Sequence, residues 1–381
     1  MVLFLHNRYR GTGGEERAVE ELAWLVRERL GEPVELLGRD SAELGRGAAA
    51  FGLLRGGRDP VEVERAVRDA HAQVVHAHNL LPSFGWRALA AARAAGARVV
   101  LHLHQYRLVC AIGVCFTRGA ECTRCHGRNT LAGVRLNCRG NAPEAIAYGA
   151  ALALWQRRLV RQADAILVPS EFARERLRAL GAPLPWERVH VLAPPLRALE
   201  AAPERSEPPR SATYALVVSR LAPEKGVDVA IDACRAAGLT LVIAGDGPQR
   251  GELEARAAAG RGVAGATVRF VGRVEAEELA RLRAGAAIAL VPSRSAETFG
   301  LAAAEAMVAG LPVAASRIGA LPELVEDDAL VPAGDAAALA QAIGRLAGDR
   351  AAGARGRERV RSVCAPSVVA EALAKVYAAS T

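Results

Sequence analysis

Two glutamates, Glu297 and Glu305, stand eight positions apart in the stretch ETFGLAAAE, and the residues between them are mostly small and apolar. The preceding AAIALVP is typical of a buried strand, and GLAAAEAMVAG is typical of a helix that ends at a glycine. We therefore expect Glu297 in the loop before this helix and Glu305 on its second turn. The N–H groups of Phe299, Gly300 and Leu301 would lie in the first turn, where backbone donors have no partner within the helix.

Two carboxylates around a helix N-terminus suit a ligand that is part polyol and part phosphate. Each carboxylate can accept hydrogen bonds from sugar hydroxyls, and the N-terminus of the helix can bind the anion. The alternative is that both acids interact favourably with the helix dipole and bind nothing.

A second stretch, SRLAPEKGVDVAI, places cations where a strand ends and a helix begins. Arg220 could clamp an anionic diphosphate through its guanidinium fork, and Lys225 could do so as a point charge. Only Lys225 and Lys375 are lysines among 49 basic residues, so a lysine persists here in a chain that otherwise uses arginine. Glu224 is expected to be a helix-start carboxylate. A solvated helix cap, with the lysine retained by chance, is the alternative.

Two stretches containing glycine also follow strands. GTGGEER, with Gly13 and Gly14, predicts a tight turn and then a helix whose first N–H groups can face an anion. Arg17 stands where the G-x-G-x-x-G fingerprint has its last glycine, so a turn without a ligand is equally compatible. IAGDGPQRGELE predicts a turn followed by a helix with proline in its first turn.

The elements that must position these residues alternate between strand and helix patterns. The predicted strands are residues 2–6, 33–37, 72–78, 97–104, 164–170, 188–192, 214–219, 239–245, 266–272, 286–293 and 311–316. Helical patterns lie between most of them, and the chain is helical from about residue 335. This alternation predicts parallel sheets covered on both faces, which bind ligands outside the carboxyl ends of their strands.

A charged stretch with several prolines at 194–212 has no apolar period and separates the chain into two halves. The fold class is therefore α/β, with two doubly wound, Rossmann-like domains facing a central cleft. We expect a first domain over 1–195 with a cysteine-rich insertion at about 106–140, a linker over 196–212, a second domain over 213–360, and a helix over 361–381 that is a candidate to pack back on the first domain.

Composition is that of a globular protein, with 51% hydrophobic and 24% charged residues. No run of 18 uncharged apolar residues occurs, and the start MVLFLHNRYRG lacks the features of a signal peptide, so we expect a cytoplasmic protein. The net charge of +8 favours anionic ligands or reflects solvated arginines. The stretch 152–162 is a candidate for peripheral contact with the inner membrane face, and a core-packed amphipathic helix is its alternative.

The E-x7-E element at 297–305, SRLAPEKG, GDGP and the glycine pair at 13–14 together resemble the retaining glycosyltransferases of family 4, which have the GT-B fold. The resemblance covers nearly the whole chain. It implies transfer of a sugar from a nucleoside-diphosphate sugar to a hydroxyl acceptor, which could be a glycan, a lipid-linked sugar or a small metabolite. It also makes the first domain the acceptor side and the second the donor side.

The resemblance further implies roles for residues of the second half. Glu305 would hold the ribose hydroxyls of the donor. Glu297 would contact the sugar hydroxyls, and the backbone N–H groups of Phe299–Leu301 would help to orient them. Arg220 and Lys225 would hold the diphosphate.

Other positions complete the implied donor site. Gly13 and Gly14 would close on the diphosphate from the other domain, and the base would pack at Arg273 and Val274. His104 matches the family's histidine near the transferred sugar. His102 lies two residues earlier on the same strand face, so strand alternation does not separate the two, and a histidine satisfied within the core is the alternative for either.

The chemistry of such a site follows from charge, because a nucleoside diphosphate leaves with growing negative charge. Arg220, Lys225 and the helix start could stabilise that charge, and with Glu297 and His104 they form the candidate catalytic set. No Asp-x-Asp motif stands at a strand end, so we predict no catalytic metal and no cofactor for catalysis. Front-face attack with the leaving phosphate as base, and retention of configuration, are implied by the resemblance alone.

Five of the seven cysteines lie within residues 110–138. Cys122 and Cys125 form a C-x2-C pair, with Cys110 before it and Cys138 after it, and this spacing predicts a structural four-thiolate zinc site. Disulfides or free thiols are the alternatives, and Cys115 and His126 are spare ligands. The other two, Cys234 and Cys364, are typical of buried cysteines.

Two other functions compete with the transferase. A sugar-nucleotide 2-epimerase shares the fold but lacks the E-x7-E element. A basic, zinc-containing nucleic-acid-binding protein would suit the net charge. Aromatic residues make up only 4% of the chain, however, and no basic run lies beside the cysteines, so we expect no nucleic-acid partner.

Overall fold

The protein is described here by a computed structural model that covers residues 1–8, 13–201, 214–259 and 267–379. The chain forms two compact units. One contains residues 1–117, 122–195 and 366–381, and the other contains residues 118–121 and 196–365. Each unit is described by itself.

The first unit is built on a parallel six-stranded sheet in the order β2-β1-β3-β4-β7-β8. Its strands are β1 (Val2–Arg8), β2 (Val34–Asp40), β3 (Val74–Ala77), β4 (Arg98–His102), β7 (Ala165–Val168) and β8 (Val189–Val191). The inner strands β3, β4 and β7 are buried except at Arg98 and mostly apolar, as expected for a sheet covered on both faces; His76 and His102 are their buried polar residues.

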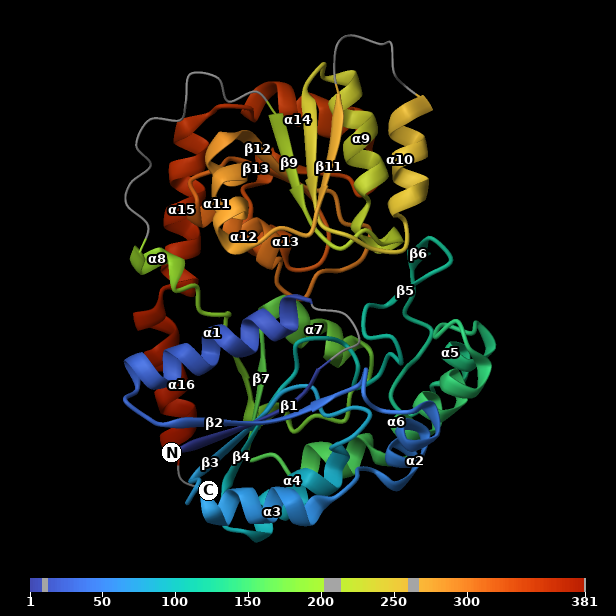
Figure 1. The fold of residues 1–381 in the computed structure, drawn as a ribbon, viewed down its shortest axis with the longest axis vertical. Helices are drawn as coiled ribbons and strands as arrows, with labels where there is room; N and C mark the ends of the chain where they lie inside the picture. Colours follow the sequence, from blue (N-terminus) through green and yellow to red (C-terminus); the bar gives the residue numbers. More distant parts are fainter. Residues whose placement is uncertain (9–12, 202–213, 260–266, 380–381) are drawn as a thin grey trace. The chain divides into compact units, whose positions relative to one another are not determined.

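Helices cover both faces of this sheet (Figure 1). On one face lie α1 (Gly14–Arg29) and α16 (Pro366–Ala378), which contact each other and share a core with strands β1, β3, β4 and β7. The other layer consists of α2 (Arg46–Arg55), α3 (Pro60–Asp69), α4 (Gly85–Ala94) and α6 (Ala142–Arg161). The remaining elements of the first unit are β5 (Phe116–Thr117), α5 (Leu131–Arg135), α7 (Glu171–Ala179) and the 3-10 turn η1 (Trp186–Arg188). The short strand β6 (Ala120–Glu121) belongs to the second unit.

The second unit has a parallel sheet in the order β11-β10-β9-β12-β13-β14. Its strands are β9 (Tyr214–Val218), β10 (Thr240–Ala244), β11 (Val268–Gly272), β12 (Ala286–Val291), β13 (Val313–Ser316) and β14 (Leu330–Val331). Counted from β9 the order is 3-2-1-4-5-6, so the direction of winding reverses between β9 and β12.

Helices of the second unit also lie on both sides of its sheet, with α9 and α10 on one side and α11 and α12 on the other (Figure 1). The helices are α8 (Ala198–Ala201), α9 (Val227–Ala236), α10 (Arg250–Ala259), α11 (Ala276–Gly285), α12 (Leu301–Val308), α13 (Leu321–Leu324), α14 (Ala336–Leu346) and α15 (Arg350–Cys364), with 3-10 turns η2 (Pro223–Lys225) and η3 (Asp327–Ala329).

The prediction of two doubly wound α/β domains is confirmed, and every predicted strand is present. The sequence pattern missed β14 and the β5–β6 hairpin, whose two-residue strands are too short to show a period. The predicted linker carries the short helix α8, and its residues 202–213 lie outside the described residues.

The boundary expected after residue 360 falls inside α15, and the second unit runs to residue 365. The last helix, α16, belongs to the first unit. There the Tyr377 hydroxyl lies 2.7 Å from His76 Nδ1, and Arg98 Nε donates to the Val376 carbonyl at 3.0 Å. Among the described residues, none of the helices combines the length and hydropathy that a membrane span requires.

Candidate active site

Two of the predicted charged residues of the second unit, Lys225 and Glu297, follow the strands β9 and β12, between which the sheet changes winding direction. In open α/β sheets ligands bind outside the carboxyl ends of the strands at such a switch point. The loop after β9 carries Lys225, and the loop after β12 carries Ser293 and Glu297. Gly226, at φ +63°, allows the first loop to approach the second, since a Cβ there would lie 2.1 Å from the Pro292 carbonyl oxygen.

Glu297 is the centre of this arrangement. Its Oε1 accepts hydrogen bonds from Lys225 Nζ at 2.7 Å and from Ser293 Oγ at 2.7 Å. Burial by itself would raise the pKa of Glu297, but the Lys225 ammonium and the two hydrogen bonds outweigh it and hold the pKa below its usual value. Glu297 is therefore ionised at neutral pH and, like Lys225, partly shielded from solvent.

Arg220 and Glu224 form a second ion pair on the same loop. Glu224 lies in the turn η2 and is buried, and its carbonyl oxygen accepts the Arg294 N–H at 2.8 Å. Glu224 thus lies just before the start of α9, and its carboxylate pairs with Arg220; its interaction with the helix dipole stays a prediction. The guanidinium itself stays largely exposed, so it can reach an anion while it remains paired.

Helix α12 begins at Leu301, one residue later than the pattern GLAAAEAMVAG indicates. Gly300 is its N-cap at φ +100°, and the first helical residue is Leu301. Phe299 and Gly300 thus precede the helix, which corrects the expectation that both lie in its first turn. Glu305 lies on the second turn as predicted, and its carboxylate pairs with the guanidinium of Arg283 from α11.

The GDGP turn interlocks three strand ends. The Leu221 N–H donates to the Asp246 carbonyl at 3.0 Å, and the Gly245 N–H donates to the Gly272 carbonyl at 2.7 Å. These bonds tie the loops after β9, β10 and β11 together. Arg273 and Val274 follow β11 directly, the first exposed and the second half-buried, and their contact with a base stays a prediction.

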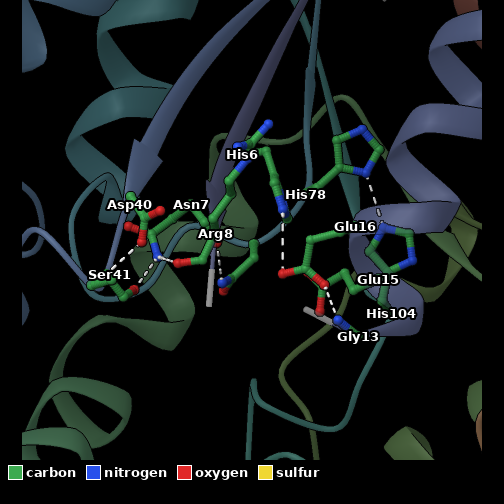
Figure 2. A network of polar contacts seen from close by, with 12 residues as sticks. His6, Asn7, Arg8, Gly13, Glu15, Glu16, Asp40, Ser41, His78 and His104 are labelled. Atoms are coloured by element: carbon green, nitrogen blue, oxygen red, sulfur yellow. Dashed lines mark hydrogen bonds and ion pairs between the residues drawn. The ribbon is translucent and has the colours of Figure 1, made fainter. Parts of the chain in front are cut away.

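In the first unit, the predicted glycine pair forms the start of α1. Gly13 is the N-cap and Gly14 the first helical residue, while residues 11 and 12 of the predicted turn lie outside the described residues. The Gly13 N–H donates to Glu16 Oε2 at 2.8 Å, and the other Glu16 oxygen lies 4.0 Å from His6 Nε2 (Figure 2). The N-terminus of α1 therefore faces the carboxyl end of β1.

The structure distinguishes His102 from His104, which strand alternation could not do. His102 is the last residue of β4, is 3% exposed, and lies 3.2 Å from His76 across the strands. His104 lies beyond the strand end and is half-buried, and its Nε2 is 2.9 Å from His78 Nδ1 (Figure 2). Burial and the neighbouring histidines lower the pKa of His104 well below its ordinary value, so its ring is neutral at pH 7.

These histidines belong to a larger buried cluster. His6, His76, His78, His102 and His104 lie on adjacent strand ends of β1, β3 and β4, and ring contacts connect them. Ring nitrogens of three of them lie within 4.8 Å of one another, the only such three-residue group in the part of the chain that the structure describes. The rings of His76 and His102 are only 8° from parallel and hydrogen-bond each other, so this cluster is a hydrogen-bonded stack.

The clustered cysteines do not gather in the same way. Among the described residues no three cysteine sulfurs lie within 4.8 Å of one another, so as they lie they do not offer a tetrahedral zinc site. Within the described residues, none of the seven cysteines is in a disulfide. Cys138 Sγ is 3.8 Å from Thr117 Oγ1, and Cys125 Sγ is 3.9 Å from the Thr130 carbonyl oxygen. The zinc site at Cys110, Cys122, Cys125 and Cys138 stays a prediction, which metal analysis of the purified protein would test.

Cys110 is expected to be the fastest of three thiols to react with iodoacetamide at pH 7. A hydrogen bond with Cys115 lowers the pKa of Cys110 to about 6, whereas burial raises the pKa of Cys234 and Cys364 to about 12. Because the thiolate is the nucleophile, mass spectrometry of peptides should show Cys110 modified at least about 100-fold faster. Equal rates at Cys110 and Cys234 would contradict this assignment.

Three partners in these sites were missed at the sequence level. Ser293 is the last residue of the predicted strand 286–293, and His78 is the last of 72–78, so a search for polar side chains at strand ends would have found both. Arg283 sits among other arginines on α11 and carries no signal of its own. Lys225 and Glu297 are in contact, whereas Arg220 pairs with Glu224 and Glu305 pairs with Arg283. Gly13, Gly14 and His104 belong to the first unit.

Comparison with known proteins agrees with this division. Residues 12–195 match the family model for a glycosyl transferase 4-like domain, and residues 212–349 match that for glycosyl transferases group 1. A glycogen synthase of Mycobacterium tuberculosis is 35% identical over 237 residues, 58% of this chain and 56% of that protein. A GDP-mannose-dependent phosphatidylinositol dimannoside mannosyltransferase of the same species is 42% identical over 115 residues, 29% of this chain and 28% of that protein. The matched part of this chain thus covers 56% of the length of the glycogen synthase and 28% of the length of the mannosyltransferase.

Solved structures show the same fold. The Anabaena protein HepE, determined with UDP and glucose, matches with a TM-score of 0.65 at 18% identity, covering 100% of this chain and 99% of that one. At this identity the likeness establishes the fold, in which two Rossmann-like domains carry the two matched segments. The chain therefore belongs to the glycosyltransferases of the GT-B fold, with a glycosyl transferase 4-like domain followed by a group 1 domain.

Proposed function

We propose that this glycosyltransferase moves a sugar from a nucleoside-diphosphate sugar to a hydroxyl acceptor with retention of configuration. The observation that carries the proposal is the contact of Lys225 and Ser293 with Glu297 at the switch point of the second sheet. This site joins a cation, which suits a phosphate, to an ionised carboxylate, which accepts hydrogen bonds from sugar hydroxyls. Family membership and the HepE structure with UDP and glucose support a nucleotide-sugar donor.

The donor would bind at the ion pairs already described. Lys225 can turn from Glu297 to the diphosphate or bridge both, because an ammonium group has three donors. Arg220 is largely exposed and adds a second cation on the same loop. Glu305 keeps lone pairs for ribose hydroxyls while it accepts from Arg283.

The reaction would proceed by attack of the acceptor oxygen on the anomeric carbon from the face that the diphosphate leaves. The bond between that carbon and the diphosphate oxygen breaks, a bond to the acceptor oxygen forms, and the acceptor proton passes to the leaving phosphate. Lys225 and Arg220 stabilise the charge that develops on that phosphate. His104 is neutral and acts as a hydrogen-bond partner near the transferred sugar. No catalytic metal is part of this proposal.

Glu305→Gln is expected to raise the donor KM about tenfold and to change kcat little, because it weakens binding that is equal in the ground and transition states. Glutamine keeps the shape of the side chain beside the buried Arg283, so loss of folding is avoided. The matched control is Glu326→Gln, which changes an acid of the same unit that pairs with Arg355 at a more exposed site. An unaltered donor KM in Glu305→Gln would count against the ribose role.

The proposed function is tested by incubating the protein with UDP-glucose and GDP-mannose and measuring release of the nucleoside diphosphate. HepE has been determined with UDP-glucose, and the related mannosyltransferase is GDP-mannose-dependent, so these two donors carry different bases. Slow release without an acceptor, faster with one, is expected. Absence of release from a wider panel of nucleotide sugars, with or without glycan and lipid-linked acceptors, would overturn the proposal.

A further inference from the structure

A large pocket lies entirely within the first unit. The space between its lining residues, including the open mouth, is about 720 Å³. Its lining comes from the segments after β3 and β4 and from helices α2, α4 and α6. His78 and His104 are both among the lining residues, so the pocket reaches the histidine proposed to stand near the transferred sugar.

The wall of this pocket is apolar and aromatic. Leu53 of α2, Leu81 before α4 and Leu152 of α6 line it together with Trp86 and Trp155. The two indole rings lie 6.0 Å apart, and Trp155 Nε1 donates to the Leu53 carbonyl at 3.1 Å, which fixes that ring against α2. A wall of this kind gains little from contact with a bare polysaccharide and much from contact with a hydrocarbon group.

Three buried polar atoms on the pocket's lining residues have no hydrogen-bond partner. They are His78 Nε2, Trp86 Nε1 and Gln156 Oε1. Buried polar groups in proteins are nearly always paired, so these three atoms are available to hydrogen-bond the polar part of a ligand. His78 and Gln156 are 3% and 2% exposed, so bulk water does not satisfy them.

The apolar surface continues outward from the wall. Phe51 and Leu54 of α2 are 53% and 48% exposed, and Leu154 of α6 is 50% exposed. Leu54 and Leu154 adjoin the wall residues Leu53 and Trp155 in sequence, Phe51 lies two residues before Leu53, and α2 and α6 pack against each other. A hydrocarbon chain longer than the pocket can therefore follow this surface.

We propose that the pocket binds the apolar aglycone of the acceptor, an alkyl or isoprenoid chain, with the attached sugar or other polar head near His104. This inference rests on the proposed function, since it names the acceptor class of the same reaction. The unpaired atoms of His78, Trp86 and Gln156 would bond the polar head where it joins the chain. Acceptors of this class carry the hydroxyl nucleophile and an apolar group on one molecule.

The first experiment measures binding without any donor. All four tryptophans of the chain lie in the first unit, and two of them line the pocket. We expect n-octyl β-glucopyranoside, kept below its micelle concentration, to change tryptophan fluorescence with a Kd at least tenfold lower than that of methyl β-glucopyranoside. Trp86→Phe and Trp155→Phe should each lose a large part of the signal, and Trp186→Phe, which changes a tryptophan outside the pocket, should keep it.

A second variant blocks the pocket without removing a reporter. Ala151 of α6 lines the pocket and is 3% exposed, so Ala151→Leu fills space there and should weaken octyl glucoside binding at least tenfold. Circular dichroism and the melting temperature show that the variant is folded. Equal affinity for the octyl and methyl glucosides, or undiminished octyl binding in Ala151→Leu, would overturn the inference.

A transfer assay tests the acceptor class separately from binding. In the transfer assay the octyl acceptor should have a kcat/KM at least tenfold above that of the methyl acceptor. Donor hydrolysis without any preference between the two acceptors would overturn the acceptor class and leave the proposed function standing. Absence of donor hydrolysis would overturn the proposed function, and with it the role of the pocket as an acceptor site.

Discussion

Replacing Lys225 with alanine is expected to lower kcat for sugar transfer about 100- to 1000-fold, the usual effect of removing one group that stabilises developing charge. The ammonium is the partner of Glu297 at 2.7 Å in a partly shielded site. Its loss would remove a cation from the proposed diphosphate site and would leave the Glu297 carboxylate its hydrogen bond from Ser293. Steady-state kinetics on the natural or octyl acceptor would measure both kcat and the donor KM.

The chain supplies a matched control for this variant. Lys375 forms an ion pair with Glu371 at the same 2.7 Å, but both side chains are more than 70% exposed. Lys375→Ala is expected to keep wild-type kinetics, because exposed pairs contribute little. Lys225→Arg should recover part of the lost rate, since it restores charge without the compact ammonium. Equal, small effects of Lys225→Ala and Lys375→Ala would contradict the role of Lys225.

Lowering the pH from 7 to 5 is expected to destabilise the first unit strongly. Five histidines are packed there, and burial lowers the pKa of each, to about 4 for His6 and about 3 for His76. In the unfolded chain their pKa returns to about 6.5, so below that pH the unfolded state binds more protons. The free energy of unfolding therefore falls as the pH decreases from about 6.5 toward the folded-state values, and is unaffected by these groups above it.

The size of this effect follows from the number of histidines. Each buried histidine lowers the free energy of unfolding by up to about 1.4 kcal/mol per pH unit below about 6.5, which is about 2 kcal/mol at pH 5. Two or three fully buried histidines would then remove a large share of the 5–15 kcal/mol that stabilises an ordinary domain. Urea unfolding followed by tryptophan fluorescence measures this unit selectively, because Trp24, Trp86, Trp155 and Trp186 all belong to it.

Two variants separate the cluster from other titrating groups. His76→Gln should reduce the slope of the unfolding free energy against pH by about 1.4 kcal/mol per pH unit, because one proton fewer is bound on unfolding. His190→Gln, which changes an exposed histidine of the same unit, should leave the slope unchanged. A flat unfolding free energy between pH 7 and pH 5 in the unaltered protein would refute the assignment of these histidines as buried and neutral.

The fold was predictable because buried parallel strands leave strong local patterns. Runs such as VLFLH and AAIALVP are apolar over their whole length, and helical patterns separate them, so each strand of more than two residues was located. The β14 strand and the β5–β6 hairpin have no such pattern. The path of α16 back to the first unit depends on long-range contacts, such as that of Tyr377 with His76, which no local window contains.

The candidate site of the second unit was predictable for a similar reason, because the carboxyl ends of parallel strands in one sheet meet at one edge. Lys225 and Glu297 were expected there and are in contact. Their mutual pairing, and that of Glu305 with Arg283, depends on side-chain positions across 72 and 22 residues of sequence. Spacing alone also could not distinguish His102 from His104, because the distinction depends on where β4 ends.

The most direct test of the central claim is a calorimetric titration of the protein with UDP-glucose and with GDP-mannose. We predict saturable binding of one of them, weakened at least tenfold in Lys225→Ala and unchanged in Lys375→Ala, since the diphosphate is held by the cation beside Glu297. Binding of neither nucleotide sugar, or equal binding to all three proteins, would contradict a donor site at this strand edge.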